Sequence, residues 1–202
     1  VGEFQEIAAL GGAGVVHQDV DAAEALHRRG DHALGFAGDA EIGALFEEER
    51  KSILTVQRDP AKLAEEVLAM RQRMREGHPN RSELFDVKHD CGGMIDIEFI
   101  VQFLVLAHAH RHAELVANLG NIALLSIMAG LGLVPVALAE QVRTAYRDYR
   151  RLQHRLRLNG AEYARVPRAD VSGQVEATRA LWRATFGAYE SEPDAPTPQG
   201  NP

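Results

Sequence analysis

Apolar residues recur at three- and four-residue steps through most of the chain from residue 39 onward, with polar residues between them. This is the period of an amphipathic α-helix. Helices are predicted at about residues 20–29, 39–54, 60–77, 93–110, 122–130, 135–159 and 172–189. No alternation typical of a strand extends beyond a few positions. The predicted fold class is therefore all-α, and short loops between long helices favour an antiparallel helical bundle.

Local signals predict several helix ends and inward faces. Asp59 followed by Pro60 is typical of an N-cap and a first helical position. Three- and four-residue spacing predicts which side chains face the core. These are Ile42, Leu45, Phe46, Ile53 and Leu54, then Leu63, Val67, Met70 and Met74, then Val142, Tyr146, Tyr149, Leu152 and Leu156, and finally Val175, Leu181, Trp182 and Phe186.

The chain is predicted to have three parts, of which composition marks only the last, and the family resemblance described below sets the bounds of the second. Residues 1–35 form an N-terminal segment whose pattern assigns it poorly. Residues 36–190 form the helical bundle domain. Residues 191–202 are rich in Pro and polar residues and are expected to be a disordered tail.

Composition narrows the classes of partner. The chain has 202 residues, 46% hydrophobic and 25% charged, and a net charge of -7. An acidic chain of this kind argues against nucleic-acid binding, which usually needs a basic surplus. The most apolar run carries Asp96, Glu98 and Gln102, so no membrane span is expected. One cysteine and no N-terminal signal suit a cytoplasmic protein.

The stretch CGGMIDIEF, residues 91–99, interrupts the helical pattern. A Gly pair before a helix can leave backbone N–H groups open to a phosphate or carboxylate, and Lys88 would add positive charge. Alternatively, the Gly pair relieves crowding and Asp96 complements the helix dipole. Asp96 and Glu98 are two residues apart, so they point about 200° apart on a helix and need different partners.

A basic segment offers Glu98 a partner. Residues 141–168 contain eight Arg against Asp148 and Glu162. A carboxylate among Ile97, Phe99 and Ile100 is costly unless paired, so we expect an Arg of this segment to hold Glu98. The predicted interaction face comprises Arg143, Arg147, Arg150, Arg151, His154 and Arg155. It would meet a phosphate, an acidic protein or only solvent.

Three other groups of residues were considered as metal or catalytic sites and are less favoured. A metal site could be built from the closely spaced His108, His110 and His112. No acid or Cys completes the ligand set, so these residues are interpreted as surface histidines. Cys91 has only His89 nearby and is interpreted as a bystander thiol. Asp19 and Asp21 precede helix formers rather than the β-branched run of a metal-bearing strand, and are interpreted as a helix cap. No metal site is predicted.

The window from Phe85 to His110 resembles the glutamine synthetase adenylyltransferase family, whose signature is close to FDxKxxxGGxxDIEF followed by a Q-[YF]-L-V-L run. The residues that fit are Phe85, Asp86, Lys88, Gly92, Gly93, Asp96, Ile97, Glu98, Phe99, Gln102, Phe103, Leu104, Val105 and Leu106. Flanking helices, including AYRDYRRLQHRLRL, are also similar. The resemblance runs from about Phe36 to about Tyr189.

The resemblance implies a C-terminal helical domain that follows a nucleotidyltransferase domain. The whole enzyme would use ATP and Mg²⁺ to place AMP on a tyrosine of glutamine synthetase, in response to glutamine and PII signal proteins. The family's metal-binding acids have no convincing counterpart here, so the chain alone is expected to be inactive, with no nucleotide bound. Its expected partners are the adjoining nucleotidyltransferase domain, glutamine synthetase and the PII protein.

The resemblance also gives the motif residues an expected role. Lys88, Gly92, Gly93 and Asp96 would face the nucleotide site of the adjoining domain, and Glu98 would be held by the long helix. On this hypothesis Glu98→Gln destabilises the domain, whereas Asp96→Asn spares folding and impairs the whole enzyme.

Two alternative functions remain open at this point. PII uridylyltransferase has a related motif of two glycines followed by acidic residues. The Asp-Ile-Glu-Phe sequence in this chain favours adenylyltransferase. A freestanding helical interaction module, with no transferase attached, is the alternative from a different class.

Overall fold

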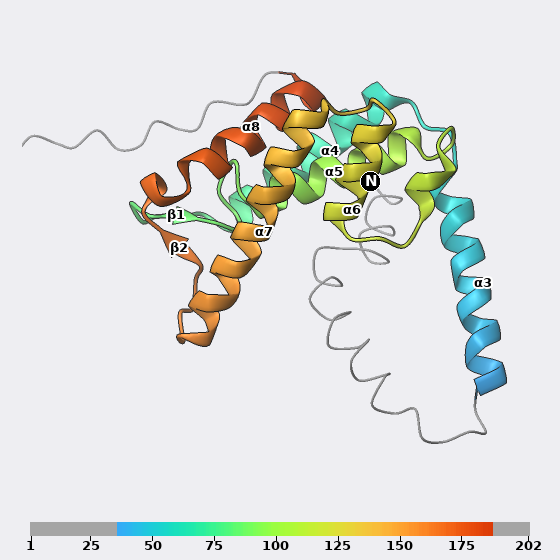
Figure 1. Ribbon diagram of the computed structural model, residues 1–202, viewed down its shortest axis with the longest axis horizontal. Coiled ribbons are helices and arrows are strands. Elements are labelled where there is room, and N and C mark those ends of the chain that lie inside the picture. The colour runs from blue at the N-terminus through green and yellow to red at the C-terminus, as the bar shows by residue number, and fades with distance from the viewer. Residues whose placement is uncertain (1–35, 188–202) are drawn as a thin grey trace, which may run out of the picture.

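The computed structural model describes the backbone of residues 36–187 and side chains from residue 43. Helices dominate this part of the chain, which confirms the all-α class (Figure 1). The elements are α3 (Phe36–Leu54), α4 (Pro60–Gly77), α5 (Met94–His108), the 3₁₀ turn η1 (Ala113–Val116), α6 (Asn121–Gly130), α7 (Val136–Leu158), the 3₁₀ turn η2 (Arg168–Val171) and α8 (Ser172–Phe186). The predicted helix at 20–29, the segment 1–35 and the tail 191–202 lie outside the described residues.

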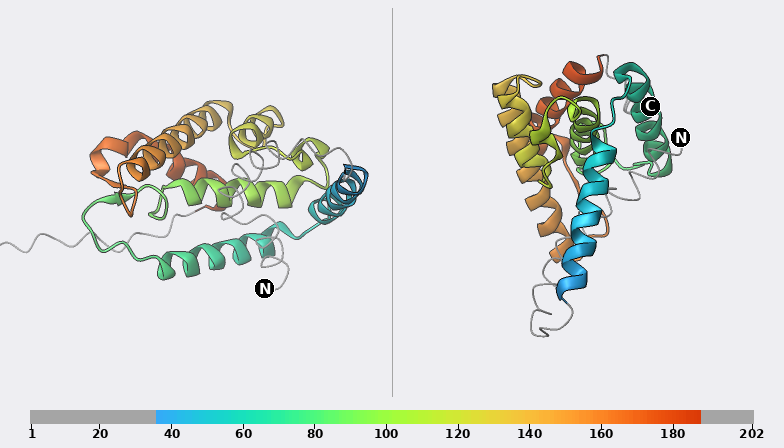
Figure 2. Two further views of the ribbon diagram at one scale, coloured as in Figure 1. Left: turned by 90° about the horizontal axis from the view of Figure 1, so that it is seen from below. Right: turned by 90° about the vertical axis from the view of Figure 1, so that its right-hand side faces the viewer.

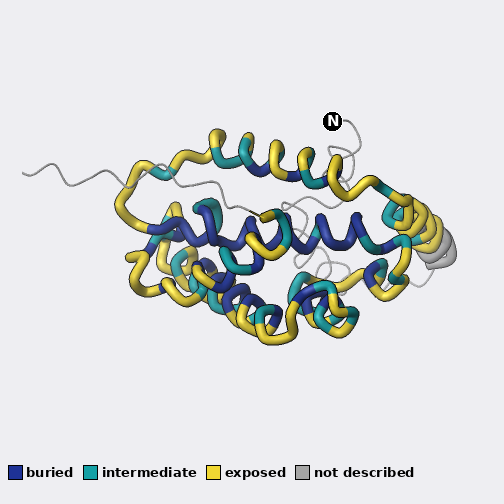
Figure 3. Tube along the Cα trace, turned by 90° about the horizontal axis from the view of Figure 1, so that it is seen from above, coloured by how far each residue is buried: buried dark blue, intermediate teal, exposed yellow. Residues whose placement is uncertain are grey.

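Helix α5 is the centre of the bundle. All of its residues except Gln102 and His108 are buried, because apolar side chains surround the whole helix rather than one stripe. Helix α4 packs on one side, and α6, α7 and α8 pack against the others (Figure 2). Figure 3 shows α5 as a nearly continuous buried run between α4 and the other helices. Its N-terminus, which carries the Gly-Gly motif, therefore meets several helices at once.

A small sheet is an addition to the all-α prediction. Strand β1 (Phe85–Asp86) pairs antiparallel with β2 (Arg165–Val166), with Phe85 opposite Val166. The backbone N–H of Val87 continues the pairing by donating to the carbonyl of Ala164 at 3.0 Å. Strands of two residues are too short for a period-two pattern, so the sequence does not reveal them. The sheet ties the segment before the motif to the segment after α7.

The predicted ends and faces of α4 to α8 are largely confirmed. Asp59 caps α4, since its carboxylate accepts a hydrogen bond from the backbone N–H of Ala61 at 2.9 Å. Leu63 and Val67 are buried on α4, as are Tyr146 and Tyr149 on α7. The last helix ends at Phe186, three residues before the predicted Tyr189.

The prediction for α3 is wrong at two positions. Leu45 and Phe46 were expected to face the core, but they are 62% and 49% exposed. Helix α3 leaves the bundle and touches it only toward its C-terminal end, where Leu54 packs against the core (Figure 1). There Arg50 also donates to the carbonyl of Val116 at 2.5 Å. Periodicity identifies an apolar face without saying what covers it.

Candidate functional site

The segment before α5 is a turn held by its own carboxylates. The Asp86 carboxylate accepts hydrogen bonds from the backbone N–H groups of Lys88 and His89, each at 3.0 Å. The Asp90 carboxylate accepts from the N–H of Asp86 at 2.8 Å. Burial alone would raise the pKa of Asp86, but the hydrogen bonds from His89 and Lys88 outweigh it and lower that pKa. Asp86 therefore stays ionised and keeps the turn in shape.

The N-terminus of α5 is closed rather than open to an anion. The N–H of Gly92 donates to the Asp96 carboxylate at 2.6 Å, and that of Gly93 donates to the carbonyl of Asp90 at 2.9 Å. The next two N–H groups, of Met94 and Ile95, donate to the carbonyls of Val87 and Lys88 at 2.9 and 3.2 Å. The backbone N–H groups that could have bound a phosphate thus already donate hydrogen bonds within the chain.

Close packing explains the Gly pair. Gly92 has φ +93°, and a Cβ atom there would lie 2.8 Å from Cγ1 of Val175 on α8. A Cβ atom on Gly93 would lie 2.9 Å from the carbonyl oxygens of both Asp90 and Val87. Both contacts are shorter than real Cβ contacts allow. The crowding interpretation of the Gly pair is the one that this geometry supports.

Asp96 forms a buried ion pair with α4. Its Oδ1 lies 2.5 Å from Nε of Arg71, and the two side chains are 1% and 6% exposed. Arg71 also donates to the carbonyl of His89 at 2.8 Å. The expectation that Asp96 faces the nucleotide site of an adjoining domain stays a prediction, and within this chain Asp96 is buried. Its carboxylate points into the bundle and joins α4 to the mouth of α5.

Glu98 points to the opposite side, as its spacing from Asp96 predicts. The hydroxyl of Tyr146 on α7 donates to Oε1 of Glu98 at 2.9 Å, and Asn121 at the start of α6 donates to the same hydroxyl at 3.0 Å. The expected helix supplies this partner, but the expected Arg does not. The sequence predicted Tyr146 only as a core position of the long helix. A buried tyrosine can bury its ring and still donate a hydrogen bond from its hydroxyl, which is how Tyr146 serves Glu98.

Burial raises the pKa of Glu98, and the Tyr146 hydrogen bond opposes that rise only in part. The pKa of Glu98 is higher in the folded state than in the unfolded state. Its contribution to the free energy of unfolding is therefore fully present when the pH is below the pKa of the unfolded state. It is lost as the pH rises through the raised pKa. Burial likewise raises the pKa of Tyr146, so its hydroxyl keeps the donated proton.

Helices α7 and α8 also bind the motif through its backbone. The hydroxyl of Tyr149 donates to the carbonyl of Gly92 at 2.9 Å. Arg179 of α8 donates to the carbonyl of Cys91 at 3.5 Å. From α4, Arg75 donates to the sulfur of Cys91 at 3.4 Å. We call this assembly the motif junction, and it comprises Gly92, Gly93, Asp96 and Glu98 with Arg71, Tyr146 and Tyr149.

The predicted interaction face divides along α7. Arg143 and Arg147 lie beside Glu140, at 2.5 and 3.9 Å. Arg150, Arg151, His154 and Arg155 are exposed toward the C-terminal half of the helix. Lys88 is half-buried at the motif and apart from this face.

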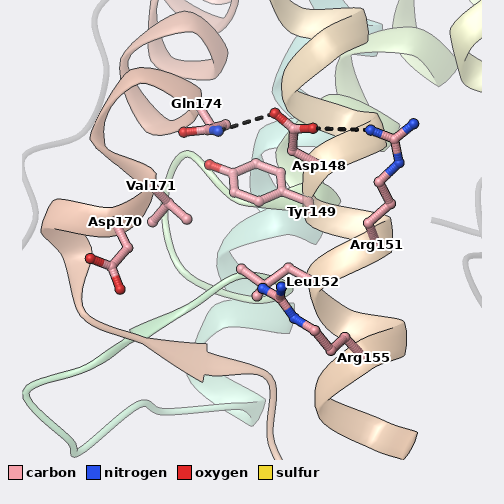
Figure 4. A pocket seen from close by; sticks show the side chains of 8 residues that line it. All are labelled: Asp148, Tyr149, Arg151, Leu152, Arg155, Asp170, Val171 and Gln174. Carbon is pink, nitrogen blue, oxygen red and sulfur yellow. Dashed lines mark hydrogen bonds and ion pairs between the residues drawn. The ribbon is translucent and has the colours of Figure 1, made fainter.

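A cavity of about 370 Å³ opens between α7, η2 and α8 (Figure 4). Arg151 and Arg155 line it together with Asp148 and Asp170, so its walls carry both signs of charge. Asp148 is engaged within the wall, since Gln174 donates to it at 3.2 Å and Arg151 lies 3.7 Å away. Arg155 and Asp170 point into the same space from opposite walls.

The histidines do not gather a ligand set. The rings of His108 and His112 have centroids 6.5 Å apart. Among the described residues, no group of three or more His, Cys, Asp or Glu side chains lies close enough to hold a metal ion. Within the same residues, no helix is both long and apolar enough to cross a bilayer.

Comparisons with known proteins give one family model and several named relatives. The family model described as GlnD PII-uridylyltransferase matches residues 61–183. A Burkholderia mallei protein named bifunctional glutamine synthetase adenylyltransferase/adenylyl-removing enzyme is 55% identical over 152 residues, which are 75% of this chain and 16% of that protein. Proteins of the same name from Aromatoleum aromaticum and Nitrosomonas europaea are 53% and 45% identical, over 75% and 80% of this chain and 16% and 19% of theirs. The chain thus spans less than a fifth of these relatives.

Gly93→Ala should destabilise the bundle by about 1–3 kcal/mol, because the added Cβ meets two backbone oxygens that cannot move independently. Gly173→Ala is the matched control, since a Cβ there meets nothing within 4 Å and Ala is the better helix former. Urea unfolding measures both. Equal stability of the two variants would contradict the packing account of the motif.

Asp96→Asn should lower the free energy of unfolding by about 3–5 kcal/mol, because it leaves the buried Arg71 guanidinium without its carboxylate. This replaces the expectation that the substitution spares folding. Glu140→Gln, at an exposed pair with Arg143, should cost at most about 1 kcal/mol. The melting temperatures of both variants are measured by thermal unfolding. Similar melting temperatures would show that Asp96 does not stabilise the fold.

Tyr146→Phe should cost about 1–3 kcal/mol at pH 7, where it leaves the buried Glu98 carboxylate without its donor. The cost should shrink as the pH falls through the raised pKa of Glu98, because a neutral carboxyl needs the donor less. Tyr163→Phe, at a side chain 52% exposed, is the control at each pH. A cost that is the same at every pH would exclude an ionised Glu98 as the acceptor.

Proposed function

Since the chain belongs to the GlnD PII-uridylyltransferase family, we propose that it is the helical domain of a glutamine synthetase adenylyltransferase. In this role it supports the transfer of AMP to a tyrosine of glutamine synthetase. The observation that carries the proposal is the 55% identity, over 152 residues, to a protein with that name. The resemblance seen in the motif thus extends over three quarters of the chain.

Adenylyltransferase is favoured over PII uridylyltransferase. The matching family model bears the uridylyltransferase name, but it covers a helical region that both kinds of enzyme share by their motif. The curated relatives at 45–55% identity are named for adenylyl transfer to, and removal from, glutamine synthetase. Identity of this degree is the stronger guide to which of the two enzymes this chain serves.

We assign the domain a supporting role in this enzyme. The motif carboxylates Asp96 and Glu98 and the N–H groups at the mouth of α5 are engaged within the bundle. The described residues do not provide the clustered carboxylates that Mg²⁺ prefers. On the resemblance to adenylyltransferases, we assign ATP and Mg²⁺ to the adjoining nucleotidyltransferase domain, to which the motif junction gives a rigid base.

The basic half of α7 is the proposed contact for a protein partner. Arg150, Arg151 and Arg155 are exposed in a chain of net charge -7, and Arg151 and Arg155 line the cavity. An acidic surface on glutamine synthetase or on a PII signal protein is complementary to it. The cytoplasm, where all of these proteins would meet, is the proposed location.

The test is an AMP-transfer assay on glutamine synthetase with ATP and Mg²⁺. The chain alone should show no transfer, whereas the longer protein that includes the preceding nucleotidyltransferase domain should be active. The supporting readout is covalent AMP on a glutamine synthetase tyrosine, detected by mass spectrometry. Activity of the chain alone would contradict the supporting role. Inactivity of both proteins would favour a helical interaction module with no transferase function.

A further inference from the structure

We draw no further inference here: the strongest candidate, the cavity between α7, η2 and α8 into which Arg155 and Asp170 point from opposite walls, belongs to the basic half of α7 already proposed as a protein contact, and nothing in the described residues shows what ligand would fill it.

Discussion

The structure depends on the buried ion pair between Asp96 and Arg71. One carboxylate holds the guanidinium of α4 at 2.5 Å and the N–H of Gly92 at 2.6 Å, so it fixes both the turn before α5 and the packing of α4. A buried pair of this kind adds little stability over apolar packing, but it is costly to break. It therefore specifies one arrangement of the helices rather than simply strengthening the core.

The remaining motif residues extend this constraint to the other helices. Glu98 reaches α7 through Tyr146, which itself accepts from Asn121 of α6, and Gly92 lets α8 approach to a distance that no side chain would allow. A motif that resembles a nucleotide-binding signature thus acts as the point where the bundle is joined. Under the proposed function, a rigid base of this kind would let one domain be held against another.

The sequence was sufficient for the helices, the Asp59 cap and the opposite directions of Asp96 and Glu98, because periodicity and spacing encode them directly. It was not sufficient for partners, which tertiary packing selects. Tyr146 replaced the expected Arg because a buried phenol donates without bringing a second charge into the core. Arg71, the partner of Asp96, lies 25 residues away on α4 and carried no local signal. Leu45 and Phe46 face outward because nothing in the described residues covers them.

The central claim is that the motif junction supports the fold and does not bind nucleotide. The most direct measurement is the KM for ATP of the full-length enzyme carrying Arg71→Gln and Asp96→Asn together, which removes both buried charges and retains hydrogen-bonding groups. If the junction is structural, the variant that remains folded by circular dichroism should show a KM for ATP within about twofold of the unchanged enzyme. A folded variant whose KM for ATP rises by about tenfold or more would contradict the account.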